Sequence, residues 1–106
     1  MFTKELHQIE QKEIIQGFKA RFVHTEHTTI AYWEIKKGSE LPLHSHVHEQ
    51  IAMVTKGSFE MTIGGKKDVY KPGKIAVIPS NVEHSGKALS DCEITDIFSP
   101  VREDYQ

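Results

Sequence analysis

Four histidines are the residues of this chain with the clearest capacity for chemistry. His44, His46 and His48 lie at alternate positions, and His84 follows much later in the chain. Imidazole is the commonest metal ligand among side chains. On an extended strand, residues i and i+2 point to the same face, so His44 and His46 can present two nitrogens to one ion. His84 can return from a neighbouring strand as a third nitrogen ligand. The pattern therefore predicts a site for one divalent metal ion.

The fourth ligand has two candidates by position alone. Gln50 shares the parity of His44 and His46 and can offer an amide oxygen, but His48 shares that parity too. A turn or bulge between His46 and Gln50 would decide which side chain points to the metal ion.

A carboxylate stands out in the last expected strand, over residues 92–98. Its alternate positions are Cys92, Ile94, Asp96 and Phe98. Burying the lone charge of Asp96 in such an apolar row is costly unless the carboxylate is paired or takes part in chemistry. Asp96 is therefore a candidate general acid/base beside the metal ion. The alternatives are an ion pair with Arg102 or Lys87, or a strand that points Asp96 outward.

Short strands separated by turns must position these groups. Strands are expected over 18–24, 28–35, 49–55, 58–63, 66–70, 75–78 and 92–98. Strands 49–55 and 58–63 are expected to pair around Lys56–Gly57, and Gly64–Gly65 is a hairpin signal. Only residues 5–16 leave room for a helical turn. Strands about ten residues apart with turns between them predict an all-β sandwich or barrel.

Composition narrows the function classes. A length of 106 residues suits one domain, and a net charge of −2 lacks the basic excess of a nucleic-acid binder. Residues 1–12 are polar and do not resemble a signal peptide, and no apolar run approaches the roughly 20 residues of a membrane span. The single cysteine, Cys92, fits a reducing compartment, so we expect a cytoplasmic protein with no membrane or nucleic-acid partner.

Two segments resemble the sequence motifs of the cupin superfamily. The first motif, over 38–57, contains Gly38, His44, His46, Gln50 and Gly57, and the second, over 73–88, contains Gly73, Pro79, Asn81, His84 and Ala88. The superfamily usually has glutamate at the Gln50 position, glycine at Asn81 and asparagine at Ala88. The resemblance implies one jelly-roll cupin domain over 1–106, a homodimer, and His44, His46, Gln50 and His84 as the metal ligands.

The segment 96–105 resembles the ending of the pectin degradation protein family. These small cupins convert unsaturated monouronates from pectin or alginate to linear ketonised sugars. The resemblance implies that Asp96, Phe98 and Arg102 act in the site. Phe98 would be an apolar wall under the sugar, with core packing as the alternative. Arg102 would bind the substrate carboxylate by a two-pronged contact, with a solvated or subunit-bridging role as the alternative.

The neutral ligand set has a chemical consequence. Three imidazoles and one amide leave the ion its full double positive charge, which suits Lewis-acid chemistry on an anionic or enolic sugar. Such ligands accept Zn, Ni, Fe, Mn or Cu and do not identify the metal. The main prediction is a sugar-acid enzyme that combines Lewis-acid and acid/base catalysis. Its alternatives are another metal-dependent cupin, such as a dioxygenase or sugar isomerase, and a non-catalytic sugar- or metal-sensing cupin.

Overall fold

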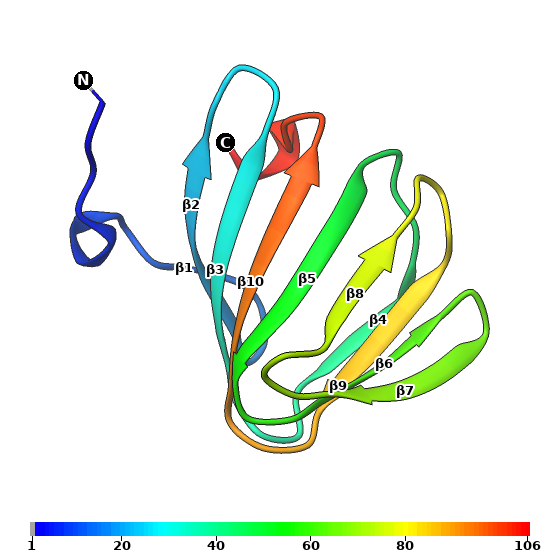
Figure 1. Ribbon diagram of the computed structural model, residues 1–106. Coiled ribbons are helices and arrows are strands. Elements are labelled where there is room, and N and C mark those ends of the chain that lie inside the picture. Colours follow the sequence, from blue (N-terminus) through cyan, green and yellow to red (C-terminus); the bar gives the residue numbers. More distant parts are fainter. Residues whose placement is uncertain (1) are drawn as a thin grey trace.

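Two antiparallel β-sheets face each other in the structure, a computed structural model that describes residues 2–106 (Figure 1). The strands are β1 (Lys12–Ile15), β2 (Phe18–His24), β3 (Thr29–Ile35), β4 (Glu40–His44), β5 (Glu49–Lys56), β6 (Phe59–Ile63), β7 (Lys66–Tyr70), β8 (Ile75–Ile78), β9 (His84–Ala88) and β10 (Cys92–Ser99). Two 3-10 turns, η1 (Leu6–Gln8) and η2 (Glu103–Tyr105), flank them. The all-β expectation is confirmed. The expected domain 1–106 also includes Met1, which lies outside the described residues.

The chain crosses between the two sheets at the turn after β5. One sheet has six strands in the order β1-β2-β3-β10-β5-β8, and the other has four in the order β4-β9-β6-β7. The predicted pairing of 49–55 with 58–63 is therefore wrong, because β5 pairs with β10 and β8 while β6 pairs with β7 and β9. Gly57, at φ +85°, packs so closely on the Asp91 carbonyl that a Cβ there would lie 2.2 Å from it. This turn leads the chain across the core.

Alternating side chains of both sheets meet in the core. The buried apolar residues of β2 and β3 pack against those of β6, and Phe18 contacts Trp33 and Phe59 edge to face at centroid distances of 6.1 and 6.3 Å. Such contacts add to the energy of apolar burial. The strand expected over 18–24 is confirmed as β2, and its alternate residues Phe18, Ala20 and Phe22 are all buried.

The N-terminal segment contains the expected helical turn and also a strand that was not expected. Residues 5–16 contain the short turn η1 and also the strand β1, which the sequence pattern does not reveal. All four residues of β1 are exposed, so no alternation of apolar and polar positions marks it. Its backbone pairing with β2 places it at the edge of the six-stranded sheet. No helix of the described residues is long and apolar enough to cross a membrane.

Candidate metal centre

Three histidines converge at one end of the barrel. His44 is the last residue of β4 and His84 the first of β9, and the two are register partners in the four-stranded sheet. His46 lies in the segment between β4 and β5 rather than on a strand. Its carbonyl accepts a hydrogen bond from the backbone N–H of Asn81, at 2.8 Å, and Asn81 has a φ of +64°. The candidate ligand atoms of the three histidines all lie within 4.8 Å of one another.

Backbone carbonyls orient all three rings. The Nδ1 atoms of His44, His46 and His84 lie 2.8, 3.0 and 3.0 Å from the carbonyl oxygens of Pro42, His48 and Val82. A ring that donates from Nδ1 keeps a lone pair on Nε2, which is the atom free to bind metal. The Nε2 atom of His84 is buried and has no hydrogen-bond partner among the described residues. Three lone pairs thus face one space.

Gln50 adds an oxygen to the same space. Its Oε1 atom lies 3.2 Å from Nε2 of His46. With Nδ1 of His46 engaged as a donor, both facing atoms are acceptors, and a cation between them would satisfy both. The other side of the amide acts on Asp96, whose pKa it lowers. The residues present therefore fit a divalent metal ion with neutral nitrogen and oxygen donors.

His48 lies beside this donor set but is not part of it. The chain bends at Val47 and His48 before β5 begins. The His48 ring lies 5.5 Å from the His46 ring and 6.5 Å from the Phe98 ring, yet its side chain is not part of the three-histidine cluster. Gln50 and His48 are the two candidates for the fourth ligand, and this bend separates them. Gln50 lines the cavity, whereas His48 does not.

The surroundings favour the neutral form of His46 and His84. Burial, followed by the charges of Arg102 and His84, lowers the pKa of His46 from 6.5 to about 4. Burial is also the main cause that lowers the pKa of His84. Metal ions bind imidazole in its neutral form, so these rings are ready to bind a metal ion at neutral pH without losing a proton.

Asp96 lies on the inner wall beside the histidines. It is 7% exposed, and its Oδ1 atom has no hydrogen-bond partner among the described residues. Burial raises its pKa from 3.8 to about 7, and the opposing effects of Gln50, Trp33 and Arg102 do not offset this. Neither Arg102 nor Lys87 forms an ion pair with it in the described structure. Arg102 pairs with Asp104 instead.

The C-terminal segment covers this end of the barrel, as the red ribbon beside the end of β10 shows (Figure 1). The Arg102 guanidinium lies between two rings, with Cζ 4.7 Å from the centroid of Phe98 and 4.2 Å from that of Tyr105. Its Nε and Nη2 atoms donate to the Asp104 carboxylate at 3.0 and 2.7 Å. The Nη1–Nη2 end of the guanidinium keeps two parallel N–H donors, which match a second carboxylate.

These groups line one cavity of about 170 Å³. Asp96, Phe98 and Arg102 line it together with the three histidines and Gln50. Trp33 and Tyr105 also line it, and neither residue stands out in the sequence. Trp33 reads as an ordinary strand aromatic, and Tyr105 lies beyond the last predicted strand. Only the diagonal position of Trp33 relative to Asp96 on paired strands could have marked it, and that pairing is not visible in the sequence.

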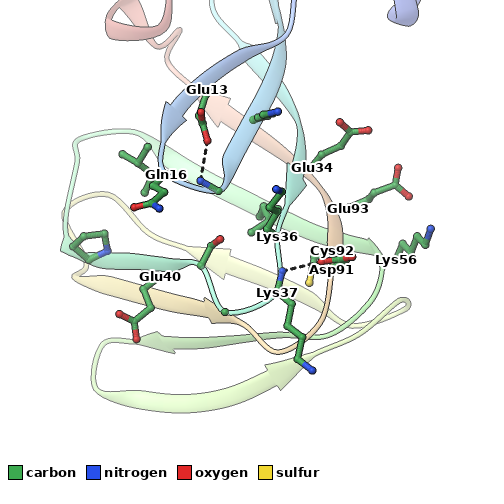
Figure 2. A pocket seen from close by; sticks show the side chains of 17 residues that line it. Glu13, Gln16, Glu34, Lys36, Lys37, Glu40, Lys56, Asp91, Cys92 and Glu93 are labelled. Atoms are coloured by element: carbon green, nitrogen blue, oxygen red, sulfur yellow. Dashed lines mark hydrogen bonds between the residues drawn. The ribbon is translucent and has the colours of Figure 1, made fainter.

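A second, wider hollow lies at the other end of the strands (Figure 2). Its volume is about 1300 Å³, and lysine and acidic side chains from several strand ends surround it. Glu13 accepts a hydrogen bond from the backbone N–H of Gly17 at 3.0 Å, and Asp91 accepts one from that of Lys37 at 2.9 Å. Dashed lines mark both hydrogen bonds in Figure 2. Nearly all its charged groups are exposed, so water satisfies them and they create no demand for a ligand.

The fold and the histidine pattern define a class. The cupin domain profile matches residues 31–98, which is more than half of the chain. The protein belongs to the cupin domain family, as the sequence motifs predicted.

Similar proteins indicate which kind of cupin this chain most resembles. The chain is 38% identical over 71 residues to "Pectin degradation protein KdgF" of Dickeya dadantii (strain 3937), a match that covers 65% of this chain and only 64% of that relative. The structure of KdgF from Halomonas sp. superposes with a TM-score of 0.89 at 29% identity, covering 94% of both chains. An RmlC-like cupin from Shewanella frigidimarina NCIMB 400 superposes with a TM-score of 0.94 at 26% identity, covering 100% of this chain and 96% of the other. This chain is thus a KdgF-like cupin.

Proposed function

We propose that this protein is a metal-dependent enzyme that converts unsaturated monouronates to linear ketonised sugars. The observation that carries the proposal is a neutral donor set beside a buried, unpaired carboxylate in a cavity small enough to suit a single sugar ring. The likeness to KdgF proteins supports the substrate class. His44, His46, Gln50 and His84 would hold one divalent transition metal ion.

The bound ion would supply Lewis-acid polarisation of a sugar oxygen. Asp96 would move the proton. The reaction is an isomerisation, so the proton that leaves a hydroxyl oxygen is returned to carbon when the enol becomes a ketone. A carboxyl group with a pKa near neutrality can both accept and return a proton at the working pH. The same burial that raises this pKa also keeps bulk water away from the proton.

Arg102 and Phe98 would hold the sugar acid. The free Nη1–Nη2 end of Arg102 offers a two-pronged contact to the substrate carboxylate, while Asp104 occupies the other edge of the guanidinium. Phe98 contacts both the Arg102 guanidinium and the His46 ring. It would therefore form the apolar wall between the metal ion and the carboxylate-binding end.

The test uses unsaturated galacturonate and metal-loaded protein, with ring opening followed by NMR. We expect conversion above the rate in buffer, loss of that conversion after chelation, and its return when a metal ion is restored. Metal analysis of the purified protein identifies the native ion. A rate no better than buffer, with the ion bound, contradicts the proposed function.

Two alternatives have their own tests. An oxygenase prefers two histidines and one carboxylate on iron, and the neutral Gln50 disfavours that ligand set. Oxygen uptake with a panel of sugar substrates would reveal such an activity, and conversion of a saturated sugar would reveal an isomerase. A non-catalytic sensor would bind sugar acid or metal with no turnover, and the substitution Asp96→Asn would leave its function largely intact.

We also propose that the protein is a cytoplasmic homodimer. The outer face of the six-stranded sheet carries exposed apolar side chains on β5 and β8, with Ile51 40%, Ile75 56% and Val77 67% exposed. Contiguous exposed apolar residues indicate an interaction surface, and a two-fold dimer would bury the same patch on both copies. Sedimentation should show a dimer for the native protein and a monomer for Val77→Lys. A native monomer contradicts the proposal.

A further inference from the structure

Two complementary polar atoms remain without partners on the wall of the metal cavity. Trp33 Nε1 and Asp96 Oδ1 are both buried, and neither has a hydrogen-bond partner among the described residues. Trp33 lies on β3 and Asp96 on β10. The register pairs Trp33 with Ile94, two residues before Asp96, so the two side chains are diagonal neighbours on the inward face of one sheet. Both line the same cavity.

Such atoms need an explanation, because burying a polar group without a hydrogen bond is unfavourable and native proteins contain few of them. The indole can only donate, and an ionised carboxylate can only accept. The indole is close enough to lower the pKa of Asp96, yet the two groups do not meet hydrogen-bond geometry with each other. A ligand group that both accepts and donates would satisfy the two atoms at once.

The donor and the acceptor are both held in place. The Trp33 ring makes edge-to-face contacts with Phe18, Phe22 and Tyr105 at centroid distances of 6.1, 5.9 and 6.3 Å. Asp96 lies on β10, where its register partners are Ala31 of β3 on one side and Ala52 of β5 on the other. The indole cannot swing toward another acceptor without breaking its packing, so its N–H is preorganised toward the cavity.

We propose that Trp33 and Asp96 form a subsite for one hydroxyl group of the ligand. The indole N–H donates to the hydroxyl oxygen, and the hydroxyl donates to Oδ1 of Asp96. A carbonyl or ether at this position leaves the ionised Asp96 carboxylate without a donor, and a methylene leaves both atoms unsatisfied. Trp33 is therefore a specificity-determining residue. The identity of the ligand as a sugar acid rests on the proposed function, whereas the demand for a hydroxyl rests on these two residues.

The test compares Trp33→Phe with the native protein. The variant keeps an aromatic ring and removes the N–H. Zinc-loaded protein is titrated calorimetrically with saturated D-galacturonate and with its 2-, 3- and 4-deoxy analogues. We expect the variant to bind galacturonate roughly 5- to 10-fold more weakly, which corresponds to one hydrogen bond. One deoxy analogue lacks the hydroxyl that the subsite binds. The native protein and the variant should bind this analogue with equal affinity. Tyr32→Phe, on the outward side of the same strand, is the matched control and should bind like the native protein.

A second measurement does not depend on the variant folding. Trp33 is the only tryptophan in the sequence, so its indole N–H gives one resonance in a ¹H–¹⁵N spectrum. Galacturonate should shift this resonance downfield, and the critical deoxy analogue should not.

Three outcomes overturn the subsite. The first is that Trp33→Phe loses affinity equally for galacturonate and for every deoxy analogue, and the second is that it loses no affinity for galacturonate. The third is that the native protein does not bind galacturonate. Failure of the proposed function is separate, since it appears as no conversion of unsaturated galacturonate while the dependence on one hydroxyl persists.

Discussion

The two ends of this barrel differ in how they treat polar groups. The metal end encloses about 170 Å³, and three of its residues, Trp33, His84 and Asp96, have a buried polar atom with no hydrogen-bond partner among the described residues. The opposite end is a hollow of about 1300 Å³ whose charged groups face water (Figure 2). The proposed chemistry lies in the smaller space because its buried polar atoms cannot be satisfied by solvent. Unmet hydrogen-bonding capacity is thus a better guide to the site than size.

The strand β10 joins the two ends and allows matched comparisons. Asp96 lies toward the metal end, and Glu93 lies at the rim of the opposite hollow. Glu93 is exposed whereas Asp96 is buried. Removing the charge of each residue therefore tests the difference between the two ends with the same chemical change on the same strand.

The largest expected effect is the loss of metal on His84→Ala. Structural zinc sites bind with roughly 10–16 kcal/mol in total, so one of four ligands contributes about 3–4 kcal/mol. We expect zinc affinity, measured by competition with a chelator, to fall on the order of 10³-fold. The control Glu93→Gln should keep native affinity. Equal zinc binding by His84→Ala and the native protein would place the ion elsewhere.

Asp96→Asn should separate turnover from metal binding. Removing a general acid/base typically costs about 10²- to 10⁴-fold in rate. We expect kcat for unsaturated galacturonate to fall by such a factor, while elemental analysis shows the same metal content as the native protein. Glu93→Gln should turn over normally. Unchanged kcat in Asp96→Asn would exclude Asp96 from proton transfer.

The same substitution should change how stability depends on pH. Because folding raises the pKa of Asp96 from 3.8 to about 7, the folded state binds the proton more tightly than the unfolded state. The native protein therefore has its full contribution from this group below about pH 4 and loses it as pH rises toward 7. In chelator-treated protein, the free energy of unfolding of Asp96→Asn relative to native should rise by up to about 4 kcal/mol between pH 4 and pH 8. Urea titrations measure this, and a difference that is constant with pH contradicts the burial effect.

Asp104→Asn should give the smallest effect. The Asp104 side chain is 56% exposed, so its ion pair with the buried Arg102 has only modest strength. Its loss frees Arg102 to rotate away from its place between Phe98 and Tyr105, and we expect KM for unsaturated galacturonate to rise about 3- to 10-fold with little change in kcat. The neighbouring variant Glu103→Gln removes the same charge and should behave like the native protein. An identical KM in both variants would show that Arg102 needs no orienting partner.

Much of the fold could be predicted from the sequence because local patterns determine it. The alternation of β2 and β10, the Gly64–Gly65 hairpin and the short β8 all follow from periodicity and turn residues. The sheet membership of β5 and β6 could not be predicted, because adjacent strands usually pair. The close packing of Gly57 on the Asp91 carbonyl at this crossing is a tertiary contact that the sequence does not reveal. The strands β1, β4 and β9 lie outside the expected ranges, and β1 has no alternation of apolar and polar positions that could reveal it.

In the candidate site too, local patterns predict some residues, whereas others depend on tertiary contacts. Residue type and spacing single out His44, His46 and His84, since few other patterns place imidazoles so close together. The competition between Gln50 and His48 depended on a bend that parity cannot reveal. Trp33, Asp104 and Tyr105 reach the cavity or its arginine only through tertiary contacts, namely strand pairing and the return of the chain after β10.

The carbonyls that orient the histidines have a consequence for the history of the site. Pro42, His48 and Val82 hold the three rings through main-chain oxygens, which every amino acid possesses. Replacing the side chain at any of these positions leaves the oxygen in place. None of these three residues lines the metal cavity, so substitutions can accumulate at all three positions while the histidine rings keep their orientation.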